Sequence, residues 1–372
     1  MKTIAISLNT TWNIYNFRLG LIKALQKEGY KVIAISPKDE YVQKLEKDGV
    51  EHHHIDMNNK GANPLEDLKL IFDYYRLFKK IDPDIVLSYT IKPNIYGSFA
   101  SLFLKIPIVC NVSGLGTVFL NNSLSSKIAK QLYKVAFKIP KKVFFQNKDD
   151  RDLFVKNKLI DIKITDILPG SGIDTTKFAP IDIKREDEKT RFLMIARLVS
   201  DKGLYEYLKA AELIKQKYTN VEFLLLGAFY PGNPTAITKD ELDLWIKKGI
   251  VNYLGVSDYV KEEIAKVDCV VLPSYREGLS RVLLESAAMA KPIITTDVPG
   301  CKDVVDDGIN GFLCKVKDYK DLAKKMERFL KTDEKERLLM GKQSRKKICE
   351  NFAEEVVIEK YLKLLKNILQ NH

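Results

Sequence analysis

Residues 269–300 read CVVLPSYREGLSRVLLESAAMAKPIITTDVPG, and this stretch carries the clearest signature of the fold. It begins with a continuous apolar run, passes through a polar loop into apolar residues at helical spacing, and ends in a second β-branched run. An apolar run without polar alternation predicts a strand that is buried on both faces. Strand, helix and strand in this order predict a parallel sheet covered by helices on both sides.

The same alternation extends in both directions from this stretch. Strand-like runs occur at residues 3–8, 31–36, 84–89, 107–112, 142–147, 191–197, 221–227, 251–255, 269–274 and 292–297. The alternation pauses at residues 168–190, which are rich in Gly, Pro and charge, and residues beyond 318 are predicted to be helical. We therefore predict an α/β protein with two doubly wound, Rossmann-like domains, at 1–170 and 171–350. A C-terminal helix at 351–372 is predicted to return to the N-terminal domain.

Length and composition agree with two soluble globular domains. The chain has 372 residues, of which 45% are apolar and 30% charged, and this excludes disordered, collagen-like and repeat proteins. The five cysteines are far apart and form no CxxC pair, so they indicate neither a disulfide framework nor a structural zinc site. We expect a reducing cytoplasm, no signal peptide and no membrane span.

Two glutamates mark the loop and helix of the opening stretch. Loops that follow parallel strands lie at the edge of the sheet where ligands bind. Glu277 is placed in the loop, Gly278 and Leu279 are predicted to open the helix, and Glu285 lies inside it. The two carboxylates would be about 12 Å apart, similar to the length of a nucleoside diphosphate. A capped helix with an exposed acid is equally compatible with this spacing.

Two cations lie at and just beyond the end of the strand predicted at 191–197. Arg197 ends this strand and Lys202 lies five residues later, at the start of the next helix. Together with the acid pair they favour a clamp for a diphosphate, although solvated surface charge remains the alternative. A dinucleotide fold is disfavoured because Gly114-Leu115-Gly116 is not followed by a glycine at position 119.

These motifs resemble those of the retaining glycosyltransferases of family 4, which have the GT-B fold with two domains facing a central cleft. The resemblance rests on Arg197 with Lys202, on the spacing from Glu277 to Glu285, and on the SGIDTTKF, DVPGC and DGINGFL segments. The N-terminal half, with NIYNFRLGLIKAL, SYTIKPNIYG and VSGLGTVFL, looks like the subgroup that acts on polyprenyl-diphosphate-linked sugars in bacterial glycan assembly, which includes N-acetylgalactosaminyltransferases.

The resemblance implies a role for each matching residue of the C-terminal domain. Glu285 would bind the ribose hydroxyls of a UDP-sugar, Glu277 the transferred sugar, and Arg197 and Lys202 the diphosphate. Backbone N–H groups of Gly278 and Leu279 would add to the diphosphate site, and the uracil would rest near Val256 and Ser257. The resemblance also implies front-face attack with retention and no need for a divalent metal or another cofactor.

Two departures from the family pattern concern the N-terminal domain. The glycine-rich loop of many relatives is replaced by residues 9–13, NTTWN. The histidine that many members place near the sugar is absent, and Ile91 stands where we expect it. Residues that follow strands of this domain are the candidates for acceptor binding: Asn13, Tyr15, Arg18, Lys92, Gly114 and Gly116. Packing of the aromatic residues under the first helix is the alternative for Tyr15.

The excess positive charge is concentrated in one segment of the sequence. Residues 85–148 contain no Asp or Glu and nine lysines. At 100° per residue, five of them share one face of a predicted helix: Lys127, Lys130, Lys134, Lys138 and Lys141. Apolar residues lie on the other side: Ile128, Leu132, Val135 and Ile139. This pattern favours an anionic membrane surface over nucleic acid, and a solvated helix face is the alternative.

The adjacent His52, His53 and His54 are not expected to bind a metal, because neighbours in a strand point to opposite faces. Taken together, the sequence predicts a retaining, UDP-sugar-dependent hexosyltransferase that is peripheral at the cytoplasmic face of the inner membrane. A transferase for a soluble acceptor, or a non-catalytic nucleotide-sugar or phospholipid binding protein, are the alternatives.

Overall fold

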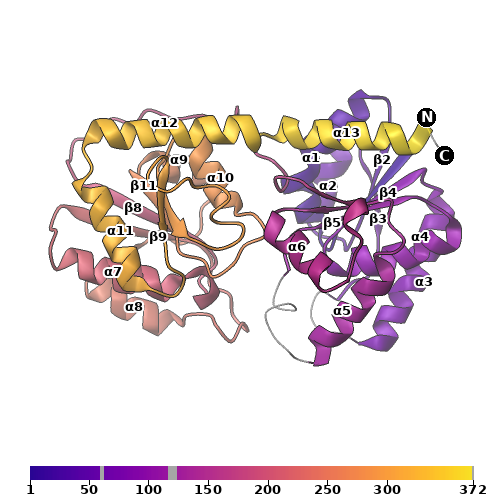
Figure 1. Cartoon of the computed structure of the whole chain (residues 1–372), viewed down its shortest axis with the longest axis horizontal. Coiled ribbons are helices and arrows are strands. Elements are labelled where there is room, and N and C mark those ends of the chain that lie inside the picture. Colours follow the sequence, from indigo (N-terminus) through magenta and orange to yellow (C-terminus); the bar gives the residue numbers. More distant parts are fainter. Residues whose placement is uncertain (59–62, 116–123, 371–372) are drawn as a thin grey trace. The chain divides into compact units, whose positions relative to one another are not determined.

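The computed structural model describes residues 1–58, 63–115 and 124–370, and it divides the chain into two compact units. Unit 1 comprises Met1–Gly172 together with the C-terminal segment Glu354–His372, and unit 2 comprises Ile173–Ala353. The C-terminal helix therefore belongs to the same unit as the N-terminal strands (Figure 1).

Unit 1 is built on a parallel sheet of seven strands in the order β3-β2-β1-β4-β5-β6-β7. The strands are β1 Thr3–Ser7, β2 Lys31–Ser36, β3 Glu51–His54, β4 Ile85–Tyr89, β5 Ile108–Val112, β6 Lys142–Phe145 and β7 Thr165–Ile167. In register, Ile4 of β1 lies opposite Val32 of β2 and Ile85 of β4. The connections change direction between β1 and β4, so the switch point of this sheet lies there.

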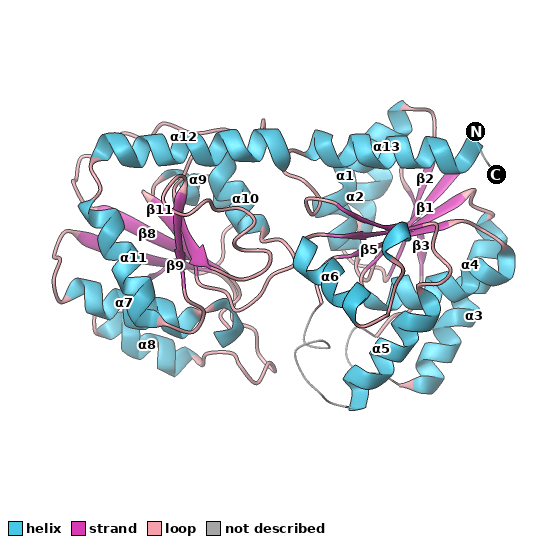
Figure 2. Ribbon diagram, viewed as in Figure 1, coloured by secondary structure: helices cyan, strands magenta, loops and turns pink. Residues whose placement is uncertain are grey.

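Helices cover both faces of the unit 1 sheet (Figure 2). The elements are α1 Thr11–Lys27, α2 Val42–Lys47, α3 Pro64–Ile81, η1 Pro93–Gly97, α4 Ser98–Leu104, α5 Leu124–Ala136, α6 Lys148–Lys156, η3 Ile162–Ile164 and α13 Glu354–Gln370. One apolar core holds side chains of α1, α2 and α13 against one face, and a second core holds those of α3, α4, α5 and α6 against the other.

Unit 2 contains a parallel sheet of six strands in the order β10-β9-β8-β11-β12-β13. The strands are β8 Thr190–Ile195, β9 Val221–Leu226, β10 Asn252–Tyr253, β11 Cys269–Leu272, β12 Ile293–Thr296 and β13 Gly311–Cys314. The helices are η4 Ser200–Lys202, α7 Leu204–Lys215, α8 Lys239–Lys247, α9 Val260–Ala265, α10 Arg281–Ala288, α11 Tyr319–Lys331 and α12 Glu334–Asn351. Helix α7 packs with α11, and α10 packs with α12.

The sequence missed three strands for identifiable reasons. Strand β3 is EHHH at the edge of its sheet and is only partly buried, so it lacks an apolar run. Strand β7 has three half-buried residues at the opposite edge. Strand β13 was missed because it begins with a glycine, which is not typical of a strand. Glycine is needed there, since a Cβ at position 311 would lie 1.9 Å from the carbonyl oxygen of Ile293.

The predicted lysine helix is shorter than the sequence suggested. Helix α5 ends at Ala136, so Lys138 and Lys141 lie beyond it, and the prediction of five lysines on one helical face is wrong for these two. Pro140 explains the early end, since a proline lacks the backbone N–H that would continue the helix. No helix in the described part of the chain is long and apolar enough to cross a membrane.

Candidate active site

The predicted clamp lies at the switch point of the unit 2 sheet. Strands β8 and β11 are neighbours at its centre, and their connections lead to opposite sides of the sheet. Ligands of such sheets bind beyond the carboxyl ends of these two strands. Arg197 and Lys202 follow β8, and Glu277 follows β11. The fold therefore places these three residues at one edge of the sheet.

Lys202 and Glu277 form a half-buried ion pair. The Lys202 ammonium donates to Glu277 Oε1 at 2.5 Å, and the Ser274 hydroxyl donates to the same oxygen at 2.7 Å. Ser274 is buried, and its hydroxyl also lies 3.2 Å from the carbonyl oxygen of Asp201. Because each group fixes the next, the cation and the carboxylate are held in place before any ligand binds.

Arg197 is the exposed member of the cluster. Its guanidinium lies over the ring of Tyr230, with Cζ 4.9 Å from the ring centroid. A cation over an aromatic face is attracted to it but keeps its N–H groups at the edge for other acceptors. Arg197 has no carboxylate partner among the described residues, so it can bind an anion without giving one up.

Two glycines allow the loops of the site to approach closely. Gly203 has a φ of +76°, and a Cβ there would lie 2.1 Å from the carbonyl oxygen of Pro273. Gly300 has a φ of +77°, and its Cβ would lie 2.4 Å from the carbonyl oxygen of Glu277. Any side chain at either position would separate the loops that carry Lys202 and Glu277.

The helix after Glu277 begins later than the sequence suggested. Gly278 and Leu279 lie in the loop, Ser280 is the N-cap, and α10 starts at Arg281. The prediction that Gly278 and Leu279 open the helix is therefore wrong, and the helix begins three residues after Gly278. The reason is that the loop is held by its neighbour after β12, since the Glu277 N–H donates to Pro299 and the Ser280 N–H to Gly300.

Glu285 lies one turn into α10 with most of its side chain buried. Arg281 Nε donates to Glu285 Oε1 at 2.9 Å. Burial raises the pKa of Glu285 above its ordinary value, and the nearby Arg281 opposes this rise. A largely buried carboxylate that is paired with Arg281 is suited to accept hydrogen bonds from neutral hydroxyls, because these add no further charge.

Val256 and Ser257 follow β10 on the same edge of the sheet. Val256 is exposed, and the Ser257 hydroxyl accepts a hydrogen bond from the Tyr259 N–H at 2.9 Å. Gly255, directly before them, has a φ of +76° and accepts from the Gly227 N–H at 2.8 Å. The backbone here is turned back toward β9, and its role toward a base stays a prediction.

The candidates of unit 1 follow β1, β4 and β5 in the chain. Asn13 donates to Asn9 at 3.0 Å, and Tyr15 packs against the ring of Tyr41. Arg18 is only 5% exposed, and its guanidinium lies 4.2 Å from the centroid of the Tyr89 ring. Its Nε has no hydrogen-bond partner among the described residues.

The segment after β4 is strained and polar. Thr90 has a φ of +66°, which is uncommon for a β-branched residue, and η1 is a π-helix. Within the described chain, Thr90 Oγ1 and Asn94 Oδ1 are buried without a hydrogen-bond partner. Strain and unsatisfied polar atoms concentrate at functional sites, so this segment adds two residues that the sequence did not single out.

Lys92 is paired within unit 1. Its ammonium donates to Asp67 at 2.9 Å, and both side chains are largely buried. Binding of an acceptor phosphate by Lys92 would therefore require it to share or leave Asp67, and this role stays a prediction. Gly114 follows β5 with a φ of +121°. Gly116 lies outside the described residues.

The three histidines of β3 have separate partners. His52 lies 3.1 Å from the Ser36 hydroxyl, His53 contacts Glu51 at 2.7 Å, and His54 contacts Asp56 at 2.9 Å. Among the described residues no group of three His, Cys, Asp or Glu side chains could hold a metal.

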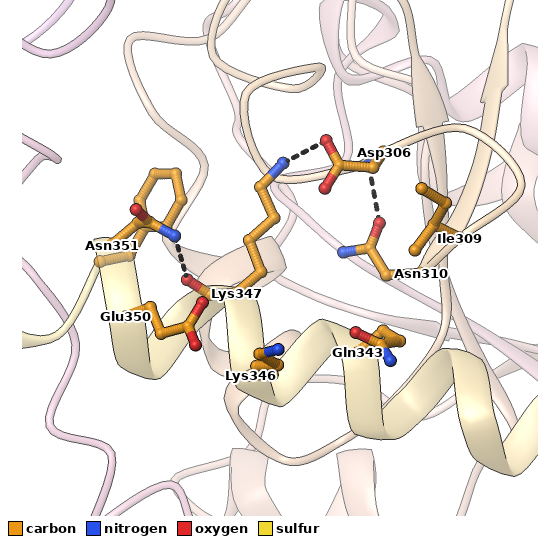
Figure 3. A pocket seen from close by; sticks show the side chains of 9 residues that line it. Asp306, Ile309, Asn310, Gln343, Lys346, Lys347, Glu350 and Asn351 are labelled. Carbon is orange, nitrogen blue, oxygen red and sulfur yellow. Dashed lines mark hydrogen bonds and ion pairs between the residues drawn. The ribbon is translucent and has the colours of Figure 1, made fainter.

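A separate hollow of unit 2 lies beside α12 (Figure 3). It has a volume of about 460 Å³, and Lys347 reaches across to Asp306 at 2.8 Å while Asp306 N–H donates to Asn310 at 2.7 Å. This hollow lies beside α12 and not after β8 and β11, so it is separate from the cluster of Arg197, Lys202 and Glu277.

Sequence reasoning missed the residues that support the clamp. Ser274 donates a hydrogen bond to Glu277, and Arg281 donates one to Glu285. The guanidinium of Arg197 lies over the ring of Tyr230. Ser274 and Arg281 lie three and four residues from the glutamates that they contact, so short spacing was an available signal. Tyr230 is 33 residues from Arg197, and only the fold brings the two together.

Comparison with known proteins agrees with this arrangement. The family model of group 1 glycosyl transferases matches residues 176–347, and that of glycosyl transferase 4-like proteins matches residues 4–147. A Campylobacter jejuni N,N'-diacetylbacillosaminyl-diphospho-undecaprenol alpha-1,3-N-acetylgalactosaminyltransferase is 30% identical over 375 residues, covering 96% of this chain and 97% of the relative. The chain belongs to the family 4 glycosyltransferases.

Other similarities fit this family. An Escherichia coli UDP-Gal:alpha-D-GlcNAc-diphosphoundecaprenol alpha-1,3-galactosyltransferase is 26% identical, covering 79% of this chain and 78% of the relative. A Rickettsia africae glycosyltransferase structure has a TM-score of 0.82 at 20% identity, covering 100% of this chain and 99% of that one. Anabaena HepE in complex with UDP has a TM-score of 0.79 at 17% identity, covering 99% and 100%. The predicted GT-B class of this glycosyltransferase is confirmed.

Proposed function

We propose that this glycosyltransferase moves a sugar from a UDP-sugar to a polyprenyl-diphosphate-linked saccharide with retention of configuration, as in bacterial glycan assembly. The observation that carries the donor half is the cluster of Arg197, Lys202 and Glu277 at the switch point of unit 2. Two cations and one carboxylate at this edge match a diphosphate and a sugar hydroxyl better than any neutral ligand.

The residues of unit 2 divide the donor between them. Arg197 and Lys202 neutralise the diphosphate, and the N-terminal N–H groups of α10 add partial positive charge, since Ser280 does not cap them with its side chain. Glu277 accepts from hydroxyls of the transferred sugar, and Glu285 accepts from the ribose hydroxyls. The uracil lies on the backbone near Val256 and Ser257.

The transfer step requires no protein nucleophile. The acceptor oxygen bonds to the anomeric carbon on the face from which the UDP oxygen departs. The electron pair of the breaking bond passes to the diphosphate, and the hydroxyl proton of the acceptor moves to a diphosphate oxygen. Arg197 and Lys202 stabilise the charge that develops on the leaving group. Two cations can supply the charge stabilisation that a divalent metal supplies in other enzymes.

Support for the acceptor comes from two directions. Both relatives named above act on undecaprenyl-diphosphate-linked sugars, and one of them transfers N-acetylgalactosamine. We propose N-acetylgalactosamine as the sugar. The acid-free window at 85–148 with its nine lysines would hold the enzyme on the anionic lipid that contains such an acceptor, at the cytoplasmic face of the membrane.

A screen tests this proposal directly. Purified protein is incubated with UDP-GalNAc, UDP-GlcNAc, UDP-Gal or UDP-Glc and with short-chain polyprenyl-diphosphate saccharides or the matching free saccharides. We expect product only with the diphosphate-linked acceptors and most rapidly with UDP-GalNAc. Product with free saccharides alone would favour a soluble acceptor, and neither transfer nor UDP release with any pair would favour a non-catalytic binding protein.

A further inference from the structure

Unit 1 exposes large apolar side chains on one of its two helical layers. Ten such side chains are exposed among its described residues, and seven of them lie on α3, α4 and α5. The opposite layer of α1, α2 and α13 exposes one, Trp12, in its described residues. Helices α3 and α5 both pack on η1, and α3 also packs on α4, so the three helices form one layer.

Helix α3 is apolar on both of its sides. Its inward side buries Tyr74 and Phe78 in the core. Its outward side carries Leu65, Leu68 and Phe72 at the spacing i, i+3, i+7, and Phe72 is 57% exposed. A helix that only covers a core is expected to be polar on its outward side. The outward leucines and phenylalanine therefore need a partner other than this core.

Helices α4 and α5 continue the pattern. Leu102 and Phe103 are exposed in the last turn of α4, and Phe103 is 68% exposed. On α5, Ile128 and Val135 are both exposed, and Val135 is 53% exposed. The core side of α5 is formed by Tyr133 and Ala136, so Ile128 and Val135 lie outside the core.

Cations accompany these apolar side chains. Helix α3 exposes Lys69, Arg76, Lys79 and Lys80, and the exposed cations of residues 85–148 include Lys105, Lys127, Lys134, Lys138, Lys141 and Lys148. Glu66 and Asp73 are the acids of α3 that are not buried, and residues 85–148 contain none. A surface that is both apolar and basic is complementary to the interface of an anionic bilayer.

We propose that the outward faces of α3, α4 and α5 form a membrane-docking surface that inserts apolar side chains into an anionic leaflet. The proposal deepens the proposed function, and rests on it only in that a lipid-linked acceptor brings the enzyme to a bilayer. The cations bind lipid phosphates and act first. Leu68, Phe72 and Phe103 then enter the boundary of the acyl chains, which adds a part of the binding that salt does not screen.

Vesicle co-sedimentation of the full chain separates the contribution of the cations to membrane binding from that of the apolar side chains. The probe is phosphatidylcholine vesicles with or without phosphatidylglycerol, at about 0.1 M and about 1 M NaCl, where the Debye length falls from about 10 Å to about 3 Å. The apolar variant is Leu68→Ser/Phe72→Ser/Phe103→Ser, and the basic variant is Lys127→Glu/Lys134→Glu/Lys138→Glu. The matched control is Leu338→Ser/Leu339→Ser, which removes two exposed leucines of α12 in unit 2.

We expect wild-type protein and the control to stay partly bound at high salt. The apolar variant should bind at least about tenfold more weakly, because two or three large side chains contribute more than 1.4 kcal/mol on leaving water, and high salt should release it. The basic variant should lose its preference for phosphatidylglycerol. Equal binding of the apolar variant and wild type at both salt concentrations would overturn the proposal.

Two further measurements separate membrane docking from contact between copies of the chain. Light scattering without vesicles should show the same mass for wild type and the apolar variant. A wild-type dimer that the apolar variant abolishes would instead assign this face to contact between copies, and would overturn the proposal. In Phe72→Trp, tryptophan fluorescence should be quenched by brominated lipid, whereas Leu339→Trp should respond no more than the two native tryptophans do.

The test of the membrane-docking surface is independent of the proposed reaction. With a short-chain, water-soluble acceptor, the apolar variant should transfer sugar at the wild-type rate. If wild type transfers to none of the acceptors but still shows salt-resistant vesicle binding, the reaction fails and the docking surface stands. If transfer occurs and vesicle binding does not, the docking surface fails alone.

Discussion

The two switch points of this glycosyltransferase differ in how completely their polar groups are paired. In unit 2, Lys202 is bound to Glu277, Glu277 to Ser274, and Glu285 to Arg281. In the described part of unit 1, Arg18 Nε and Thr90 Oγ1 are buried without hydrogen-bond partners. The two edges have the same position in similar sheets, so the difference lies in the side chains.

This difference suggests a division of labour. A cluster in which Lys202, Glu277 and Glu285 already have partners is ready for its ligand and needs little rearrangement to stabilise charge. Buried polar atoms without partners each cost about 1–3 kcal/mol, and a ligand or water that satisfies them recovers this free energy. We therefore assign the rigid cluster of unit 2 to the donor and the unsatisfied edge of unit 1 to the acceptor.

The strongest loss of activity is expected for the cations of unit 2. Arg197→Ala and Lys202→Ala should each lose about 2–4 kcal/mol of transition-state stabilisation, or about 30- to 1000-fold in kcat/KM, because the leaving diphosphate loses a cation. Lys209→Ala on the exposed side of α7 is the matched control and should behave as wild type. Steady-state kinetics measures this, and full activity in both variants would disprove the clamp.

A smaller effect is expected at Glu285. Glu285→Gln should lower kcat/KM for the donor by about 10- to 100-fold, because a neutral amide accepts hydroxyl hydrogen bonds less strongly than a carboxylate. Competition by UDP and by uracil locates the loss. If the variant binds UDP as tightly as wild type does, Glu285 does not hold the ribose.

The raised pKa of Glu285 also gives a stability signature. Between its ordinary pKa of 4.5 and its higher pKa in the folded protein, the folded state holds more protons than the unfolded chain. This contribution to the free energy of unfolding is complete below 4.5 and is lost as pH rises through the folded pKa. Glu285→Gln removes this dependence, so Tm against pH should show the variant gaining relative to wild type as pH rises.

Much of this architecture could be predicted from the sequence. Continuous apolar runs revealed the buried central strands, and the charged residues after β8 and β11 marked the edge that carries Arg197, Lys202 and Glu277. Edge strands such as β3 were not predicted, because a partly buried strand does not need an apolar pattern. Contacts between distant segments, such as Arg197 with Tyr230, also escaped, because no local pattern encodes them.

For unit 1, Arg18 offers a more modest test of the comparison. Arg18→Lys keeps the charge but loses the planar fork, so the KM for the acceptor should rise about tenfold while UDP-sugar hydrolysis stays unchanged. Lys23→Ala, at an exposed ion pair on the same helix, is the control. A purely structural Arg18 would lower Tm in Arg18→Lys without any change in the acceptor KM.

Metal removal is expected to change the rate least. Transfer should continue at its full rate in excess EDTA, because Arg197, Lys202 and the start of α10 bear the charge of the diphosphate. The rate is measured with and without added Mg²⁺ after chelation. Complete loss that Mg²⁺ restores would assign part of this role to an ion.

Analysis of the reaction product is the decisive measurement for the proposed transfer. Wild-type protein is incubated with UDP-GalNAc and a short-chain polyprenyl-diphosphate saccharide, and the product is examined by mass spectrometry and by NMR of the new anomeric proton. We expect one added N-acetylhexosamine in the α configuration of the donor, and no product from the same saccharide without its diphosphate. A β-linked product, or transfer to the free saccharide alone, would contradict the proposed function.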